Sequence, residues 1–295
     1  MATLPASARH DLTDDQWNLL KPLLPAQHHL GRPRSWCRRG LINGILFRVR
    51  TGVPWRDLPE RYGPWWRVYD LFTCYQRTGV WSTIHTQLLS QAHQNGRLSW
   101  EFSVDSTTSR GHVHATGARH DSHHRHRDEP ADHGFGRSRG GWSTKIHLAV
   151  DAGVCPVSCV LTPGQVGDAP QMPEVLDRVR VPTPGPGRPC TTPSRVLADK
   201  AYSSRRNRSY LRGRGIATTI SQPADQVGHR LRRGSAGGRP PAFDPEIYAR
   251  RNVVERCIGF LKHNRGCAMR FDKLVVQFYA SVQVGCIRQW LRRLS

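Results

Sequence analysis

The sequence has few acidic residues and no long apolar run. Asp and Glu number 22 against 44 Lys and Arg, so that the formal net charge of the 295-residue chain is +22. The first residues contain no apolar stretch of the kind that forms a secretory signal, and the longest uncharged, apolar-leaning run, 274–287, is too short to cross a bilayer. We therefore expect a globular protein with no membrane partner, and the positive excess favours a polyanion, above all nucleic acid, as its partner.

Cysteine patterns typical of disulfide scaffolds or zinc sites are also missing. The eight cysteines are scattered singly, and Cys155 and Cys159, four apart in a predicted strand, lie too far apart to share one tetrahedral metal. We expect all eight to be reduced, mostly buried thiols of a cytoplasmic protein. Seven of the fifteen histidines fall between His112 and His133, but no spacing matches a zinc site well, and a polar loop near DNA is the favoured interpretation.

Residues 1–98 carry the signals of helices, and we predict an all-α, helix-turn-helix-like DNA-binding domain there. Thr13 and Gln16 form a capping-box pattern ahead of an apolar helical period. The segment from Trp55 to Gly79 predicts a short helix, a glycine turn and a longer helix, which is the layout of a helix-turn-helix. An ordinary helical hairpin explains the same pattern, but a basic flank favours DNA binding: Arg32, Arg34, Arg38, Arg39, Arg48 and Arg50.

After residue 98 the pattern becomes that of a mixed α/β domain, which we expect over residues 99–295. Strands are predicted at 102–108, 145–151, 156–162, 196–198 and 216–220, and helices at 172–179, 204–214, 246–265 and 275–292. Long loops are expected at 110–140, at 181–195, which is rich in Pro and Gly, and at 225–244, which is basic.

Three carboxylates stand out in this second half. Asp105 lies in a predicted strand, and Asp199 ends the apolar run 196–198, at a position where ligands of α/β domains usually bind. Glu255 lies on a late helix. Converging carboxylates supply hard oxygen ligands, which suit Mg²⁺ or Mn²⁺ rather than zinc, and two such ions can promote phosphoryl transfer. For a fourth carboxylate, Asp168, we favour a structural role as the cap of a helix that starts near Pro170.

The segment around Glu255 carries a further pattern. Tyr248, Arg251, Glu255 and Lys262 lie at offsets of 0, 3, 7 and 14, which on one continuous helix places them within an arc of about 60°. One carboxylate between cations suits a site that binds a metal and phosphate together.

These segments closely resemble bacterial insertion-sequence transposases of the DDE class, in the branch with a Tyr-Arg-Glu-Lys signature. Tyr248, Arg251, Glu255 and Lys262 match the signature, VDSTT contains the first aspartate, Asp105, and LADKAYSS contains the second, Asp199. Similar segments include LTDDQWNLLKPLLP, GVPWRDLPERYGPW and GRSRGGWSTKIHLAVD, so that the resemblance spans nearly the whole chain.

The resemblance implies a ribonuclease H-like catalytic core in which Asp105, Asp199 and Glu255 are catalytic residues and hold Mg²⁺ or Mn²⁺, two ions in all. It implies binding of the element's terminal inverted repeats, DNA cleavage and transfer of 3′-OH ends to target double-stranded DNA by at least a homodimer. Arg251 and Lys262 would then contact phosphate and Tyr248 would pack on a DNA end. We further predict DNA-backbone contacts at Lys200, where a solvated lysine is an equal alternative, and at Arg230, Arg232, Arg233 and Arg239.

Two other functions explain part of the pattern. A non-catalytic DNA-binding protein derived from a transposase would keep the helical module without the chemistry, although the presence of all three carboxylates and the signature argues against it. A metal-dependent nuclease without strand transfer would use the same carboxylates, and only its products would distinguish it.

Overall fold

A mixed sheet forms the centre of the computed structural model, which describes residues 9–26, 36–117, 129–138, 140–183, 185 and 187–295. The long strand β1 (Glu101–Gly111) pairs antiparallel with β3 (Gly141–Asp151) and parallel with β5 (Arg195–Ala198). Beyond β3 lies β4 (Pro156–Pro163), antiparallel, and beyond β5 lies β6 (Ala217–Ile220), parallel.

The strand order β4–β3–β1–β5–β6, with three antiparallel strands followed by two parallel ones, is that of a ribonuclease H-like core. Two short strands extend it, since β2 (Gly136–Ser138) pairs with β3 and β7 (Met269–Arg270) pairs with β1. The α/β fold class and this core, expected from the resemblance, are confirmed, as are all five predicted strands within a few residues.

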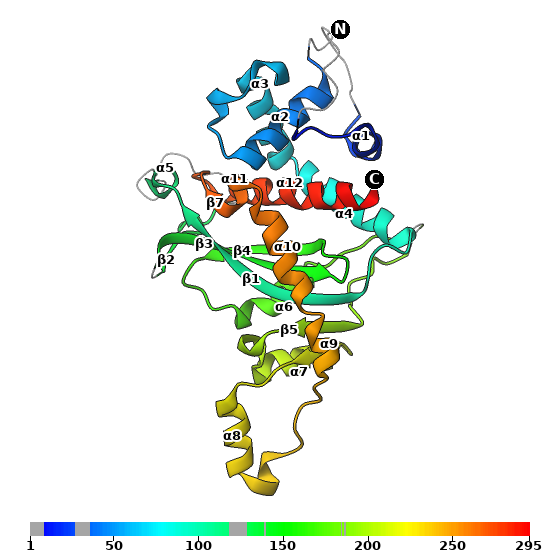
Figure 1. Ribbon diagram of the computed structural model, residues 1–295, viewed down its shortest axis with the longest axis vertical. Helices are drawn as coiled ribbons and strands as arrows, with labels where there is room; N and C mark the ends of the chain where they lie inside the picture. The colour runs from blue at the N-terminus through cyan, green and yellow to red at the C-terminus, as the bar shows by residue number, and fades with distance from the viewer. Residues whose placement is uncertain (1–8, 27–35, 118–128, 139, 184, 186) are drawn as a thin grey trace.

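Helices cover both faces of the sheet (Figure 1). The α-helices are α1 (Asp14–Leu20), α2 (Arg38–Thr51), α3 (Trp65–Arg77), α4 (Val80–Gln94), α5 (Val113–Thr116), α6 (Met172–Asp177), α7 (Arg205–Gly213), α8 (Ala224–Arg232), α9 (Pro245–Ala249), α10 (Asn252–Lys262), α11 (Arg265–Ala268) and α12 (Val275–Leu294). The capping box of Thr13 and Gln16 is present at the start of α1, as predicted.

The buried side chains form two clusters. The larger one joins the N-terminal helices, α10, α12 and one face of the sheet, and includes Ile146, Leu148 and Trp290. The smaller one lies under α6 and α7, on the face of Val104 and Ala149. Because the last helix packs against α1, α2 and α4, the N-terminal helices share a continuous core with the sheet.

Four local predictions are corrected. The helix expected over 246–265 is interrupted at Arg250 and Arg251, where hydrogen bonds between residues three apart replace the α-helical pattern, and again after Lys262. The basic loop at 225–244 contains α8 and a 3-10 turn, and the loop at 110–140 contains α5 and β2. The short helix of the expected helix-turn-helix consists of two 3-10 turns, Trp55–Asp57 and Glu60–Tyr62. Leu58 and Pro59 separate the two turns, and Gly63 follows the second.

Several arginines of the basic N-terminal flank form contacts within the protein. Arg48 is buried and donates to Asp272, with 2.7 Å between Nη2 and Oδ1, so that it holds α2 against the C-terminal segment. Arg38 donates to Tyr75 and Arg39 pairs with Asp14. Arg32 and Arg34 lie outside the described residues, as does much of the histidine-rich segment, 118–128.

The cysteines and the membrane criterion can both be read from the described residues. All eight cysteines are free and five of them are buried. No helix in the described ranges is both long enough and apolar enough to cross a membrane.

Candidate active site

The sheet brings the two candidate aspartates together. In the parallel pairing of β1 with β5, Val104 lies opposite Ala198. The next residues along the two chains are Asp105 and Asp199, and neighbouring strands lie about 4.8 Å apart. The Asp199 side chain accepts a hydrogen bond from the Ala201 N–H at 2.9 Å, which caps the turn after β5 and fixes where the carboxylate leaves the strand.

The surroundings of Asp105 change the pKa of its carboxyl. Burial raises the pKa of the Asp105 carboxyl, and the nearby charges of Asp199 and Asp168 raise it further. The Ser106 N–H, which donates to Oδ1 at 2.7 Å, and the Arg251 guanidinium act in the opposite direction. A carboxylate that is costly to ionise beside other carboxylates is a site where a cation would bind favourably.

An arginine, Arg251, links the third carboxylate, Glu255, to Asp105. Arg251 Nη1 lies 3.3 Å from Asp105 Oδ2, and Arg251 Nη2 lies 2.6 Å from Glu255 Oε1. Helix α10, which carries Glu255 in its first turn, packs against β1 and β3. One guanidinium therefore joins the strand-borne aspartate to the helix-borne glutamate, and Glu255 itself remains about half exposed, with 54% of its side chain accessible.

The break between α9 and α10 changes the geometry of the four-residue pattern. Tyr248 belongs to α9, while Glu255 and Lys262 belong to α10, so that the four side chains do not share one helix face. Tyr248 still lies beside Arg251, whose guanidinium carbon is 5.8 Å from the ring centre, and its hydroxyl accepts a bond from Ser221 at 3.3 Å. The break lies where Arg250 and Arg251 face Glu101 and Asp105, the carboxylates of β1.

A polar network behind Asp105 was missed from the sequence. Asp168 Oδ1 accepts hydrogen bonds from Lys145 Nζ at 2.9 Å and from Ser106 Oγ at 2.7 Å, and His147 Nδ1 lies 3.8 Å away. Burial opposes ionisation, but the bonds from Lys145 and Ser106 hold the pKa of Asp168 below its usual value. The prediction that Asp168 caps the following helix is wrong, because its side chain makes no capping bond and faces the sheet.

The register explains this network, since Ser106 lies opposite His147 and Thr108 lies opposite Lys145 on the antiparallel strands. Residues directly opposite each other share one face of a sheet. The alternation of polar Lys145 and His147 around apolar Ile146 was the available signal, but it could be used only once the pairing with Ser106 and Thr108 was known.

The remaining cations lie farther out. Lys262 is seven residues after Glu255 on α10, about 10 Å along the helix axis, and burial lowers the pKa of its amine. Lys200 is exposed beside Asp199. The predicted backbone contacts of the basic segment lie on and after α8, which projects from the body in Figure 1: Arg230, Arg232, Arg233 and Arg239.

The donors fit a hard cation in chemistry, because Asp105, Asp199 and Glu255 offer only carboxylate oxygens. As placed, no three His, Cys, Asp or Glu side chains of the described residues lie close enough to form a ready-made metal site. Arg251 occupies the space between Asp105 and Glu255 instead, so that a cation there would compete with the guanidinium.

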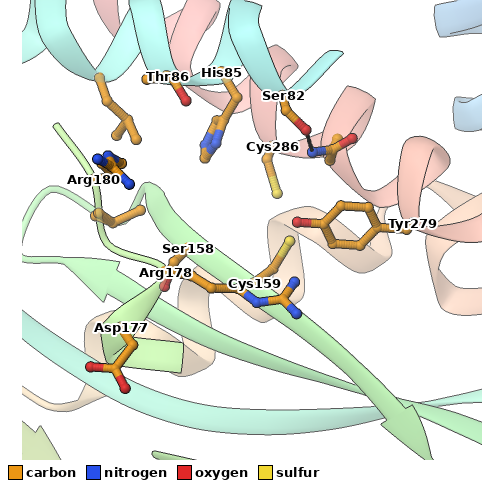
Figure 2. A pocket seen from close by; sticks show the side chains of 13 residues that line it. Ser82, His85, Thr86, Ser158, Cys159, Asp177, Arg178, Arg180, Tyr279 and Cys286 are labelled. Carbon is orange, nitrogen blue, oxygen red and sulfur yellow. Dashed lines mark hydrogen bonds between the residues drawn. The ribbon is translucent and has the colours of Figure 1, made fainter. Parts of the chain in front are cut away.

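A separate pocket of about 270 Å³ lies between α4, β4 and α12, away from these carboxylates. Figure 2 shows Cys159, Cys286 and Tyr279 pointing into it, with Arg178 beside them. None of the residues that line it belongs to the predicted site. Core side chains such as Val157 and Cys286 line it together with exposed polar ones such as Arg180, and we assign no chemistry to it.

Two family models match the chain. Residues 12–85 match a model described as putative transposase of IS4/5 family, and residues 97–280 match the transposase DDE domain. The putative transposase for insertion sequence element IS402 of Burkholderia cepacia is 31% identical over 150 residues, which cover 51% of this chain and 63% of that protein. The corresponding protein of element IS6501 from Brucella ovis is also 31% identical over 150 residues, covering 51% of this chain and 99% of that one.

Among solved structures, the Mos1 transposase paired-end complex with left transposon end matches 82% of this chain and 82% of its own chain at 14% identity. The TM-score of 0.22 is too low for this match to support the fold, which rests on the strand order and pairing described above.

Proposed function

The chain belongs to the DDE transposases of bacterial insertion sequences, and we propose that it cuts DNA at the ends of its element and joins the freed ends to target DNA. The observation that carries the proposal is the pairing that makes Asp105 and Asp199 neighbours, with Glu255 joined to Asp105 through Arg251. We propose these three carboxylates as the catalytic residues.

Asp105, Asp199 and Glu255 would together hold two ions of Mg²⁺ or Mn²⁺. The bound ions would supply an activated water or hydroxyl and stabilise the leaving oxygen. The chain's own part is to fix the carboxylates: β1 and β5 hold the two aspartates, and the Asp168–Lys145–Ser106 network holds the backbone next to Asp105. Arg251 would neutralise Asp105 and Glu255 before the cation binds, and would afterwards be free to contact a phosphate.

DNA contacts are proposed for the cations around the site. Lys262 and Lys200 have no carboxylate partner within the described ranges; Lys262 lies two turns after Glu255 on α10, and Lys200 follows Asp199. Tyr248, in ring contact with Phe243 at 5.1 Å, offers an aromatic surface for a DNA end. The cations of the α8 segment, namely Arg230, Arg232, Arg233 and Arg239, would follow the DNA backbone. Two element ends must be held at once, so that we expect at least two copies on DNA.

The test is to map the products. A plasmid that carries the gene's own flanking DNA is incubated with the purified protein and Mg²⁺ or EDTA, and the ends are sequenced. Asp105→Asn is the variant, and Asp177→Asn, which changes a carboxylate outside the site, is its matched control. We expect cuts at the flanking repeats together with joined products. Both should be lost when EDTA replaces Mg²⁺ and in the Asp105→Asn variant, and both should remain in the Asp177→Asn control.

The other products would change the proposal. Cuts without joined products would indicate a nuclease. DNA binding without cuts, equal in both variants and in the unaltered protein, would indicate a non-catalytic DNA-binding protein.

A further inference from the structure

A second pocket, of about 460 Å³, opens between α7 and the beginning of α8. Three arginines of α7, Arg205, Arg208 and Arg212, line it. The remaining wall is polar as well, with Ser203 before α7, Ser209 on α7, Gln222 before α8 and Gln226 in the first turn of α8. No aromatic or acidic side chain lines it, so that the pocket offers many hydrogen-bond donors and positive charge but no surface on which a base could stack.

The three arginines lie on one face of α7. Their offsets of 0, 3 and 7 place them within an arc of about 60° on a helix of nine residues. Like charges at such spacings repel one another by a few tenths of a kcal/mol per pair. A face of this kind is stabilised when an anion binds between the guanidinium groups.

These arginines lack the carboxylate partners that their neighbours have. Arg178, at the end of α6, pairs with Glu174 of that helix at 2.8 Å, and Arg214, at the end of α7, pairs with Asp177 of α6 at 3.0 Å. Within the residues that the structure describes, Arg205, Arg208 and Arg212 form no ion pair with a carboxylate.

Arg208 is the most constrained of the three. Its Nη2 donates to Ser203 Oγ at 2.8 Å and to the Ile220 carbonyl at 3.0 Å, while its Nε has no hydrogen-bond partner among the described residues. Burial lowers the pKa of this guanidinium, which no nearby carboxylate offsets. The side chain is thus held in place by neutral groups, and its charge remains available to an anion.

The chain links the pocket closely to Asp199. Ser203 is four residues after Asp199, and four residues of chain span at most about 13 Å, which is about four nucleotides of one DNA strand. On its other side, Gln222 follows Ser221, whose hydroxyl contacts Tyr248. The pocket therefore lies along a path that joins the second aspartate to the signature tyrosine.

We propose that this pocket, which we call the α7 pocket, binds a phosphodiester group of the DNA strand within about four nucleotides of the bond that is cut. Arginine forks match phosphate oxygens in pairs, and the side-chain amides of Gln222 and Gln226 can donate to the remaining oxygens. Ser203 already donates to Gln226 Oε1 at 3.0 Å, so that it positions this wall of the pocket. This inference rests on the proposed function, because it takes the strand at Asp199 as its ligand.

The experiment measures the affinity of the full chain for a labelled duplex of the element's end at 50 and 200 mM NaCl. The variant is Arg205→Gln with Arg212→Gln, which changes two exposed side chains and leaves the bonded Arg208 in place. The control is Arg206→Gln with Arg188→Gln, which removes the same charge from exposed arginines that do not line the pocket. Thermal unfolding checks that both fold.

Losing two phosphate contacts should reduce the change in affinity between the two salt concentrations about tenfold, and the control should keep the salt dependence of the unaltered protein. Equal salt dependence in variant and control would overturn the proposal. Calorimetry with inorganic phosphate is the second arm: phosphate binding that only the variant loses, with its DNA affinity unchanged, would assign the pocket to free phosphate and would also overturn it.

The α7 pocket and the proposed function can fail separately. If no protein cuts DNA but the variant alone loses salt dependence, the pocket stands and the transposase activity does not. If the unaltered protein cuts and joins while variant and control bind DNA alike, only the pocket fails.

Discussion

The arginines of the molecular body and those of α7 and α8 have different surroundings. In the body, Arg48 pairs with buried Asp272, and Arg293 pairs with Asp151 at 2.6 Å. Arg270 is buried and donates to the carbonyls of Asp272 and Lys273. On α7 and the projecting α8, exposed arginines such as Arg212 and Arg233 have no such partners among the described residues. The comparison indicates that the paired arginines hold the fold, whereas the unpaired ones are available to an anionic ligand.

The sharpest way to break this comparison is to remove the partner of a buried arginine. Asp272→Ala leaves the Arg48 charge buried without its carboxylate, which should lower the free energy of unfolding by about 3–5 kcal/mol. Urea denaturation measures the loss. Asp14→Ala, which breaks the exposed pair with Arg39, is the control and should cost about 1 kcal/mol or less. Equal losses in both variants would mean that burial of the pair is immaterial.

A second prediction concerns a buried histidine. Burial, the main cause, and the nearby Lys145 lower the pKa of His147 to about 4 from 6.5. The folded protein then binds fewer protons than the unfolded chain between these values, so that the stability is complete above pH 6.5 and falls as the pH drops toward 4. The loss is on the order of 3 kcal/mol.

Urea midpoints between pH 7 and pH 4 measure this effect. His147→Gln should remove this part of the pH dependence, whereas His263→Gln, at an exposed position, should leave it. If both variants keep the full decline, the acid sensitivity of the fold arises elsewhere.

Metal removal sharpens the comparison at the site. Burial and the Asp199 charge raise the pKa of Asp105 above its usual value of 3.8. The free energy of unfolding therefore falls as the pH rises from 3.8 through the raised pKa, and at neutral pH the ionised carboxylate destabilises the fold. In EDTA at pH 7, Asp105→Asn should therefore be at least as stable as the unaltered protein.

Adding Mg²⁺ at ten times its dissociation constant should stabilise the unaltered protein by about 1.4 kcal/mol and Asp105→Asn much less. Thermal unfolding with and without Mg²⁺ provides the measurement. An equal gain in the two proteins would place the ion away from Asp105.

The smallest expected effect on stability comes from the outermost arginines. Arg233→Gln with Arg239→Gln should change the free energy of unfolding by about 0.5 kcal/mol or less, because both side chains are exposed. The salt dependence of DNA binding should nevertheless fall by about 0.9 per lost contact in a plot of log affinity against log salt. An unchanged slope would mean that α8 does not follow the DNA backbone.

The buried helices and strands could be predicted from the sequence because burial of one face imposes a regular spacing of apolar residues. The apolar neighbours of Asp105 and the run ending at Asp199 marked β1 and β5, and the family resemblance supplied their pairing in a ribonuclease H-like core. Thr13 and Gln16 placed the start of α1, since capping depends on residues three apart.

The surface and the long-range contacts were harder to predict. Helix α8 has no fully buried side chain, so that its apolar period was too weak to distinguish it from a loop. The break at Arg250 and Arg251 coincides with contacts to β1, nearly 150 residues earlier in the chain. Local helix propensity carries no information about such distant contacts. Arg48 was counted in the basic flank that favours DNA binding because its partner, Asp272, lies 224 residues away and could not be foreseen.

The central claim is that Asp105, Asp199 and Glu255 act as one catalytic set, and the most direct test is the rate of the first DNA cut in single-turnover conditions with Mg²⁺. Asp105→Asn, Asp199→Asn and Glu255→Gln should each lower this rate on the order of a thousandfold, about 4 kcal/mol, with little loss of DNA affinity. Asp177→Asn should cut at the rate of the unaltered protein. Cutting by any of the three site variants at the unaltered rate would contradict the assignment of that residue and the three-carboxylate account.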